Sequence, residues 1–181
     1  MYSSKKALIL YSGGRDSSSA VVEMVRVGYL VKLFTYQVGI PELTGLRGDS
    51  APDIRHQELI KAFPQQVDRD RVITGNTYLI RKLAIKKTNT THVVYPIALA
   101  LAVHTSAILY CLENDISDIV SGYSGYQAEE DRYIEQRSDF LVLTVEFLRE
   151  YGITYHTPII KKTKQQVMDI LEQWCISSNS L

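Results

Sequence analysis

The chain is poor in cysteine and has no excess of charge of either sign. Only two of its 181 residues are cysteines, Cys111 and Cys175, and neither belongs to a Cys-x-x-Cys pair. We therefore expect no zinc site and no redox disulfide. Twenty basic and twenty acidic residues give a formal net charge of zero, which argues against capture of nucleic acid or an acidic membrane by total charge. A small neutral or anionic ligand is the better expectation, with no stable nucleic-acid binding.

Long apolar runs are also missing. The longest, residues 93–103, contains Pro96 and is far shorter than the roughly 20 residues that span a membrane. It predicts a buried helix start or strand and no membrane contact. The apolar residues 7–11 are too few for the core of a signal peptide, which favours a cytoplasmic protein. Ten glycines, five prolines and no visible repeat predict one folded domain over residues 1–181.

What is present is an alternation of short β-rich runs with helix-like segments. It predicts an α/β fold of Rossmann-like type, with a parallel five-stranded sheet and helices on both faces. The expected strands are Ala7–Tyr11, Leu30–Gln37, Arg71–Thr74, Asp118–Ser121 and Ile153–His156. The expected helices are Ser17–Val27, Asp53–Phe63, Ile97–Glu113, Glu129–Tyr151 and Lys164–Trp174.

The loops between these elements predict where a ligand would bind. Residues 39–52 contain three glycines and two prolines, which predicts a long, functional loop. Ligands of such sheets bind beyond the carboxyl ends of the strands. The loops that start at Ser12, Gly39 and Ser121 should therefore face one crevice.

The most informative segment follows the first expected strand. Residues 12–17 read Ser-Gly-Gly-Arg-Asp-Ser and lead directly into an expected helix. Glycine tolerates the positive φ that such a turn needs, and the helix adds unpaired N–H groups and the positive end of its dipole. The segment therefore predicts a phosphate-binding loop. The structural alternative is a Gly-Gly turn followed by a helix cap.

The loop lacks the lysine of a Walker A motif. Its spacing resembles the pyrophosphatase loop of the PP-loop ATP enzymes, the adenine nucleotide alpha hydrolase-like group, which split ATP between the α- and β-phosphates and pass AMP to an acceptor. The resemblance implies ATP as a cofactor and an ATP-binding set that comprises Ser12, Gly13, Gly14, Arg15, Asp16 and Ser17. Asp16 is the candidate partner of a Mg²⁺ ion or of an amide.

Later residues narrow the resemblance. Four segments come in the order in which the 7-cyano-7-deazaguanine synthases of queuosine biosynthesis carry similar motifs. They are Asp-Ile-Val-Ser-Gly at 118–122, Tyr-Ile-Glu-Gln-Arg-Ser-Asp-Phe-Leu at 133–141, His-Thr-Pro-Ile at 156–159 and Thr-Lys at 163–164. Arg55-His56 is similar to a further pair of that family. With the loop, the similarity extends from Ala7 to about Leu171.

The resemblance implies an ATP-dependent carbon–nitrogen ligase that adenylates the carboxylate of 7-carboxy-7-deazaguanine or a close analogue. Ammonia then attacks, giving an amide and then a nitrile. Such a site must stabilise negative charge with amides, cations and Mg²⁺. The implied catalytic residues are Asp16, Arg137 and Lys164, and the implied substrate-binding residues are Arg55, His56, Tyr133 and Glu135. An exposed ion pair at Arg137 and a helix start at Lys164 are the structural alternatives.

Aromatic and apolar residues predict two further contacts. Tyr123 lies in a glycine-rich segment beside the expected crevice and is a candidate to stack a flat purine-like ring. Covering the edge of the core is its structural alternative. The apolar residues between Phe140 and Leu148 make a wider face than one helix stripe needs, which predicts a homodimer contact or burial within the domain.

The chain also departs from the family pattern. The four-cysteine zinc cluster is missing, Pro-Ile-Ala-Leu at 96–99 replaces Pro-Gly-Arg-Asn, and Gln136 stands where the family has a cysteine. The acceptor is therefore left open between ammonia and an amine on a protein partner, as in relatives from bacterial and phage nucleobase-modification and antiviral defence clusters. Two other functions also stay open: a nucleotide-binding partner protein with reduced catalysis, and a tRNA-thiolating enzyme, which needs a sulfur-carrying cysteine near the site.

Overall fold

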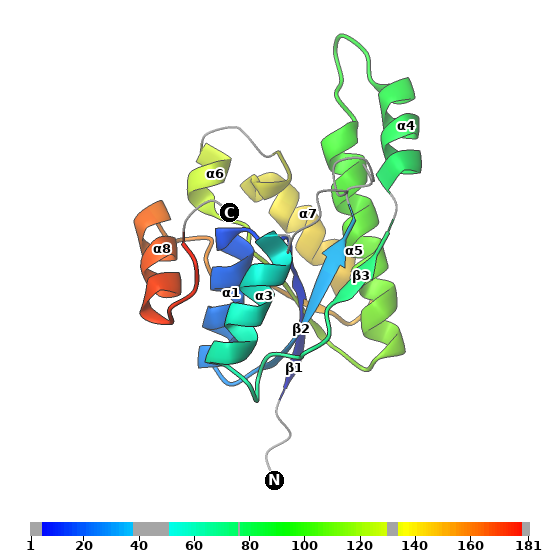
Figure 1. Ribbon diagram of the computed structural model, residues 1–181. Helices are drawn as coiled ribbons and strands as arrows, with labels where there is room; N and C mark the ends of the chain where they lie inside the picture. Colours follow the sequence, from blue (N-terminus) through cyan, green and yellow to red (C-terminus); the bar gives the residue numbers. More distant parts are fainter. Residues whose placement is uncertain (1–4, 38–50, 76, 130–133, 179–181) are drawn as a thin grey trace.

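The computed structural model describes residues 5–37, 51–75, 77–129 and 134–178, which form a five-stranded sheet covered by helices (Figure 1). All strand pairs are parallel, and the strand order is β3-β2-β1-β4-β5. The strands are β1 Lys6–Leu10, β2 Leu30–Tyr36, β3 Val72–Thr74, β4 Asp118–Ser121 and β5 Thr154–His156. The five predicted strands are confirmed, each with ends within one residue of the prediction.

The centre of the sheet is the place where the direction of winding changes. Strand β1 pairs with β2 on one side and β4 on the other, so that Leu10 lies beside both Phe34 and Ser121. The connections that leave β1 and β4 then run to opposite faces of the sheet. A crevice at the carboxyl ends of two such strands is where doubly wound folds bind ligands.

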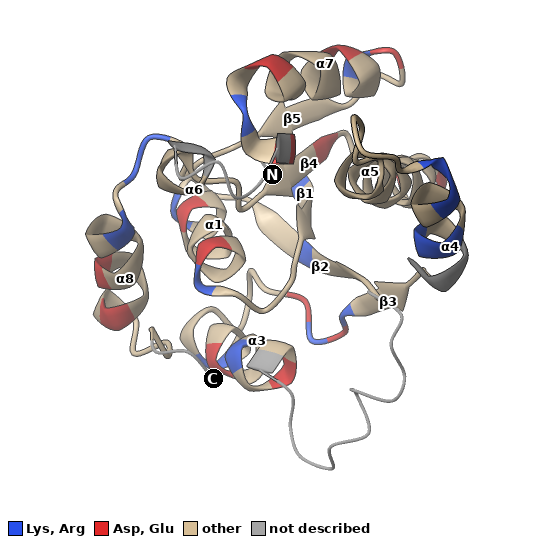
Figure 2. Ribbon diagram, turned by 90° about the horizontal axis from the view of Figure 1, so that it is seen from above, with Lys and Arg blue, Asp and Glu red and all other residues tan. Residues whose placement is uncertain are grey.

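Helices cover both faces of the sheet (Figure 2). One face carries α1 Arg15–Arg26, α3 Ala51–Ala62 and α8 Lys164–Gln173, and the other carries α5 Tyr95–Glu113 and α7 Ser138–Arg149. Helix α4, Thr77–Lys87, packs against α5. The short helix α6, Gly125–Glu129, and the 3₁₀ helix η1, Ile134–Gln136, follow β4.

The strands are apolar on both faces because each face meets a layer of helices. Ile9 and Leu33 point into the core under α1, α3 and α8. Leu8 and Phe34, their neighbours in sequence, point into the core under α5 and α7. Cys111 lies in this second core with no exposed surface, as expected of a small core residue.

Three helix predictions need correction. The single helix predicted over Glu129–Tyr151 is wrong: α6 ends at Glu129, and α7 begins only at Ser138, after Arg137 in an extended conformation. Helix α4 was not predicted, because its mixture of basic and apolar residues has no clear period. Pro52 was assigned to the loop but lies in the first turn of α3, where proline's missing N–H costs no helical hydrogen bond. The rest of the predicted loop, 39–50, lies outside the described residues.

The apolar stretch 93–103 is a helix start, but it is only partly buried: Ala100 is 6% exposed, whereas three of its large side chains face solvent. Val93, Ile97 and Leu101 are 67%, 40% and 53% exposed. By length and composition alone, α5 is apolar enough to cross a membrane, and 28% of its most apolar window is buried inside the protein. The helix packs against the sheet through its second half, at Ala107, Ile108 and Cys111.

Charge is spread unevenly over the surface. Helix α4 carries four basic residues, Arg81, Lys82, Lys86 and Lys87, and the chain has no acidic residue between Asp70 and Glu113 (Figure 2). The protein therefore has a basic helix, α4, although its formal net charge is zero. A net charge of zero thus does not exclude contact between α4 and a polyanion.

Candidate nucleotide-binding site

The predicted phosphate loop connects β1 to α1 at the centre of the sheet. Gly13 adopts a φ of +75°, in the left-handed region. A Cβ on Gly13 would also lie 2.3 Å from the Cα of Pro52, at the start of α3. Both the backbone conformation and the close approach of α3 therefore require glycine here.

Two serines hold the loop closed. The N–H of Gly14 donates to Ser12 Oγ over 3.2 Å, and the Ser17 hydroxyl donates to the Gly14 carbonyl over 3.1 Å. The two Oγ atoms are themselves 3.2 Å apart. The serines thus fix the loop as well as offering hydroxyl groups beside the helix end.

The start of α1 has no side-chain cap. Gly14 occupies the N-cap position in an extended conformation with φ −71° and ψ 165°, and no side chain accepts a hydrogen bond from the first turn. A helix end keeps unpaired N–H groups and the positive end of its dipole. An anion seated on Gly14–Ser17 would satisfy them, as phosphates do at other helix starts.

The loop after β4 lies directly against the phosphate loop. A Cβ on Gly122 would be 2.5 Å from the backbone nitrogen of Ser17 and 2.6 Å from its Cα. Only glycine lets the two backbones approach this closely. The predicted meeting of the Ser12 and Ser121 loops is therefore seen, whereas the third loop of that prediction, at Gly39, lies outside the described residues.

Asp16 is held by the chain itself. Its Oδ1 accepts a hydrogen bond from the Tyr126 hydroxyl at 2.5 Å, and its Oδ2 accepts one from Gln127 Nε2 at 2.6 Å. Burial raises the pKa of the carboxyl group, and the bond from Tyr126 opposes this shift. Each oxygen of Asp16 therefore has a protein donor.

A Mg²⁺ cage is not found beside the loop. Over the described ranges, no three His, Cys, Asp or Glu side chains gather closely enough to hold a metal ion. Mg²⁺ in nucleotide sites is held by one or two carboxylates together with phosphate oxygens and waters. Asp16 accepts one hydrogen bond on each oxygen, so a Mg²⁺ ion there would compete with Tyr126 and Gln127 for the carboxylate.

Arg55 and His56, predicted to bind substrate, are buried and bonded to backbone. Arg55 Nη1 donates to the Gly13 carbonyl at 2.5 Å and Nε donates to the Ser177 carbonyl at 2.9 Å. Burial lowers the pKa of Arg55. His56 Nε2 lies 2.9 Å from the Asp68 carbonyl. The arginine thus ties the phosphate loop to the C-terminal segment, through contacts that no sequence pattern reveals.

Tyr123 faces inward, toward His104 and Tyr155. Burial raises the pKa of its hydroxyl group. The Tyr155 hydroxyl lies 3.1 Å from Nε2 of His104, whose Nδ1 lies 2.7 Å from the Ala100 carbonyl. Since a carbonyl only accepts, Nδ1 carries the proton and Nε2 accepts from Tyr155. The Tyr123 ring lies edge-on to His104 with centroids 6.5 Å apart.

The remaining predicted residues lie in η1 and at the starts of α7 and α8. Glu135, in η1, is half-buried, and burial raises its pKa. Arg137, at the N-cap of α7, is exposed and lies 3.4 Å from Asp139. Lys164 is the exposed first residue of α8, behind a Thr163 capping box. Tyr133 lies outside the described residues. The ion pair of Arg137 with Asp139 and the place of Lys164 at the start of α8 match their structural alternatives.

Sequence reasoning missed the polar residues that join these parts. Tyr126 and Gln127 bond to Asp16, and Gln136, 7% exposed, bonds to Gln127. Glutamine has no motif of its own here. The only signal was the place of Gln136 inside the segment 133–141, directly after Glu135.

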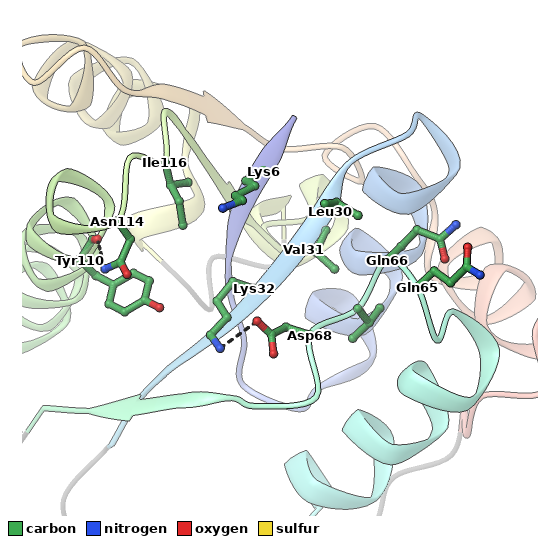
Figure 3. Close-up of a pocket in the computed structure, with 11 residues that line it drawn as sticks. Lys6, Leu30, Val31, Lys32, Gln65, Gln66, Asp68, Tyr110, Asn114 and Ile116 are labelled. Carbon is green, nitrogen blue, oxygen red and sulfur yellow. Dashed lines mark hydrogen bonds and ion pairs between the residues drawn. The ribbon is translucent and has the colours of Figure 1, made fainter. Parts of the chain in front are cut away.

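A pocket of about 420 Å³ lies at the amino ends of β1 and β2, at the opposite end of the strands from the phosphate loop (Figure 3). It is lined by Lys6 and Lys32 at the amino ends of β1 and β2, together with Asp68, Tyr110 and Ile116. Lys32 forms an ion pair with Asp68 at 3.0 Å. None of the predicted site residues lines this pocket, which is therefore separate from the phosphate loop.

Comparison with known proteins identifies one family. The model described as queuosine biosynthesis protein QueC matches residues 6–179. No curated protein matches the chain.

Solved structures with this fold include three RNA-related proteins. A predicted subunit of a tRNA methyltransferase from Methanocaldococcus jannaschii has a TM-score of 0.54 at 16% identity, with 93% of this chain and 76% of that chain covered. A 4-thiouridine synthetase solved with RNA and ATP has a TM-score of 0.61 at 13% identity, covering 94% and 40%. The U34-tRNA thiolase NcsA from Methanococcus maripaludis has a TM-score of 0.58 at 14% identity, covering 97% and 58%. At these identities the likeness establishes the fold alone.

Proposed function

Because this chain belongs to the QueC family of queuosine biosynthesis proteins, we propose that it is an ATP-dependent ligase that forms AMP and pyrophosphate. Its substrate is the carboxylate of 7-carboxy-7-deazaguanine or of a close analogue. The acyl group passes to an amine, either ammonia, giving the amide and then the nitrile, or an amine on a protein partner.

The observation that carries the proposal is the uncapped start of α1 behind the Ser12–Ser17 loop. Gly13 holds the turn, the two serines brace it, and Gly14 leaves the first N–H groups of the helix without a side-chain partner. Such a site favours a polyphosphate, because the helix end supplies donors and positive potential together. Ser12, Gly13, Gly14, Arg15 and Ser17 are the residues that we propose bind ATP, with Asp16 beside them.

The proposed reaction reaches the amide in two steps. A carboxylate oxygen of the acid attacks the α-phosphorus, the bond to the β-phosphate oxygen breaks, and pyrophosphate leaves. The amine then attacks the carbonyl carbon of the acyl-adenylate and AMP leaves, while the amine gives up a proton. Donors fixed before the reaction stabilise the charge that develops on phosphate in the first step. Going on to the nitrile would need a second ATP, because the amide oxygen must attack its α-phosphorus and then leave as part of AMP.

The cations that we propose for this charge are Arg137 and Lys164. Both side chains are exposed, at the starts of helices α7 and α8. We assign Glu135, Tyr133 and Tyr123 to the acid side. Arg55 and His56 would act on the acid through the backbone that they hold, since both side chains are buried.

A homodimer in the cytoplasm is part of the proposal. Val142, Leu143 and Val145 on α7 are 58%, 63% and 42% exposed, whereas Leu148 of the same helix is fully buried. The apolar face is therefore wider than the domain needs, and a second copy would cover the remainder. Sedimentation at micromolar protein concentration tests it, and a monomer there would contradict it.

Exchange of labelled pyrophosphate into ATP tests the function. We expect exchange that depends on 7-carboxy-7-deazaguanine and that is lost on joint Ser12→Ala and Ser17→Ala substitution. Ser117→Ala is the matched control, because this serine bonds to Asp118 at the amino end of β4, away from the loop. Mass spectrometry of the products, with and without ammonia, identifies the acceptor.

The same assay separates the alternatives. A nucleotide-binding partner protein of a modification or antiviral system would bind ATP without acid-dependent exchange. A tRNA-thiolating enzyme would need a reactive thiolate. Burial raises the pKa of Cys111 to about 12, so this thiol stays protonated, and only Cys175 is exposed. The structure thus favours transfer to nitrogen over transfer of sulfur.

A further inference from the structure

A continuous chain of hydrogen bonds joins the phosphate loop to the acid side of the crevice. The N–H of Ser124 donates to Oε1 of Gln136 at 2.9 Å, and Nε2 of Gln136 donates to Oε1 of Gln127 at 3.0 Å. Nε2 of Gln127 then donates to Oδ2 of Asp16 at 2.6 Å. The Tyr126 hydroxyl donates to the other oxygen, Oδ1, at 2.5 Å. The chain thus ends on the one carboxylate of the loop.

The direction of this chain is fixed at its start. A backbone N–H only donates, so Gln136 must present its oxygen to Ser124 and its nitrogen to Gln127. Gln127 must in turn present its oxygen to Gln136 and its nitrogen to Asp16. Asp16 is therefore required to accept at Oδ2. Aligned amide dipoles of this kind strengthen one another, particularly where water is excluded.

The surroundings hold the chain in one arrangement. Ser124 is fully buried and Gln136 is 7% exposed. The start of α6 is fixed as well, because Gly125 N–H donates to the Ile160 carbonyl at 2.9 Å, and a Cβ there would lie 2.6 Å from the same oxygen. Breaking one link would leave a buried donor or acceptor without a partner, which is costly.

We infer that Asp16 is the terminal acceptor of this chain, and that Gln127 and Gln136 are positioning residues that hold the segment of Glu135 and Arg137 at the phosphate loop. Asp16 then acts through its two hydrogen bonds and not as a ligand of Mg²⁺. The inference rests on the proposed function, because that function assigns Glu135 and Arg137 to the acid.

The consequence for catalysis is a separation of binding from rate. Losing the chain leaves Ser12, Gly13, Gly14 and Ser17 in place, so the dissociation constant for ATP should stay unchanged. The acid would lie at a different distance from the α-phosphorus, and a misplacement of about 1 Å costs about 100-fold in rate. The loss should therefore appear in kcat of acid-dependent exchange and not in ATP binding.

The first experiment breaks the chain at its two glutamines. Gln127→Leu and Gln136→Leu should each reduce acid-dependent exchange by about 100-fold with unchanged equilibrium binding of ATP. Gln165→Leu is the control, because this exposed glutamine bonds only along α8, to Asp169. Wild-type kcat in both glutamine variants would overturn the inference.

The second experiment moves the charge along the chain. Asp16→Asn alone can accept from Gln127 only with its oxygen, because the fixed direction of the chain prevents Gln127 from turning. Its amide group then faces the Tyr126 hydroxyl, which loses its acceptor and must turn to accept instead. Adding Gln127→Glu restores every link: the new amide donates to one carboxylate oxygen, and the other oxygen still accepts from Gln136. Exchange in the double variant should return to within about tenfold of wild type.

The swap also separates a failed inference from a failed function. If exchange is lost in Asp16→Asn and stays lost in the double variant, Asp16 acts by its own charge and the inference is wrong. If the wild type itself shows no acid-dependent exchange, the proposed function fails. The unfolding midpoint then decides the inference: Asp16→Asn should lower it and the double variant should restore it, while additive losses would overturn the hydrogen-bond chain.

Discussion

The proposed nucleotide side and the proposed acid side of the site are built in different ways. The nucleotide side is one run of six residues, 12–17, and works through its backbone: a positive φ at Gly13, an extended Gly14 and the first turn of α1. The acid side joins segments far apart in sequence through side chains, such as Gln127 to Asp16 and His104 to Tyr155, which are 111 and 51 residues apart.

The difference shows which part of the site tolerates change. A backbone site depends on glycines and on the absence of nearby Cβ atoms, so its requirements are local and strict. A side-chain site depends on matched donors and acceptors, which other residue pairs can supply. This contrast accounts for a loop that keeps its family pattern and an acid side that has lost several family residues.

The largest expected effect tests the strictness of the backbone site. In Gly122→Ala, the new Cβ would lie 2.5 Å from the Ser17 nitrogen, so the loop and β4 must separate. We expect about 100-fold loss of exchange and a loss of about 1–3 kcal/mol in the free energy of unfolding. Gly28→Ala is the control: its Cβ meets open space, and its φ of +92° costs about 1–2 kcal/mol by strain. Equal activity in the two variants would refute the contact argument.

Much of the nucleotide side could be predicted from the sequence. Ser-Gly-Gly-x-Asp-Ser after an apolar strand indicates a turn and a helix start by local rules alone. The five strands followed from apolar runs bounded by turn residues. These features depend on neighbours in sequence, which is why their positions agree with the structure to within one residue.

The acid side could be predicted only in part. Arg55 looked like a ligand, yet it donates to the carbonyls of Gly13 and Ser177, 42 and 122 residues away. The break between α6 and α7 was missed for a related reason: Gln136 turns inward to Ser124. Long-range hydrogen bonds of this type have no period and no motif in the sequence.

The next effect concerns Arg55 as a brace and not a substrate ligand. Arg55→Ala removes the two hydrogen bonds that the guanidinium group donates to the Gly13 and Ser177 carbonyls. The Glu58 carboxylate, which accepts from the Ser177 N–H at 2.8 Å, then remains without the arginine's positive charge nearby. We expect a loss of about 3 kcal/mol in the free energy of unfolding, measured in urea without ligand. In Arg26→Ala, which removes an exposed pair with Glu23, the loss should stay below about 0.5 kcal/mol. A stable Arg55→Ala protein that binds the acid weakly would restore the ligand role.

A smaller effect tests the buried histidine behind Tyr123. Burial lowers the pKa of His104 below its usual 6.5. Just below pH 6.5, His104 therefore binds a proton in the unfolded chain and stays neutral in the folded protein. Stability is thus present above about pH 6.5 and falls as the pH drops below it, by at most about 1.4 kcal/mol per pH unit. His104→Gln should remove this slope in urea unfolding between about pH 6.5 and 5. Parallel curves for the two proteins would show that His104 does not carry it.

The smallest effect on folding should come from Arg137, and it separates the two sides most cleanly. Its pair with Asp139 is exposed, with Nε and Oδ1 3.4 Å apart, so Arg137→Gln should leave the unfolding midpoint unchanged. Acid-dependent exchange should nevertheless fall, because the proposed cation is gone. Asp139→Asn removes the same ion pair and keeps the cation, so it should retain exchange. Equal loss in both variants would assign the effect to the start of α7, and full activity in both would place the cation of the acid side elsewhere.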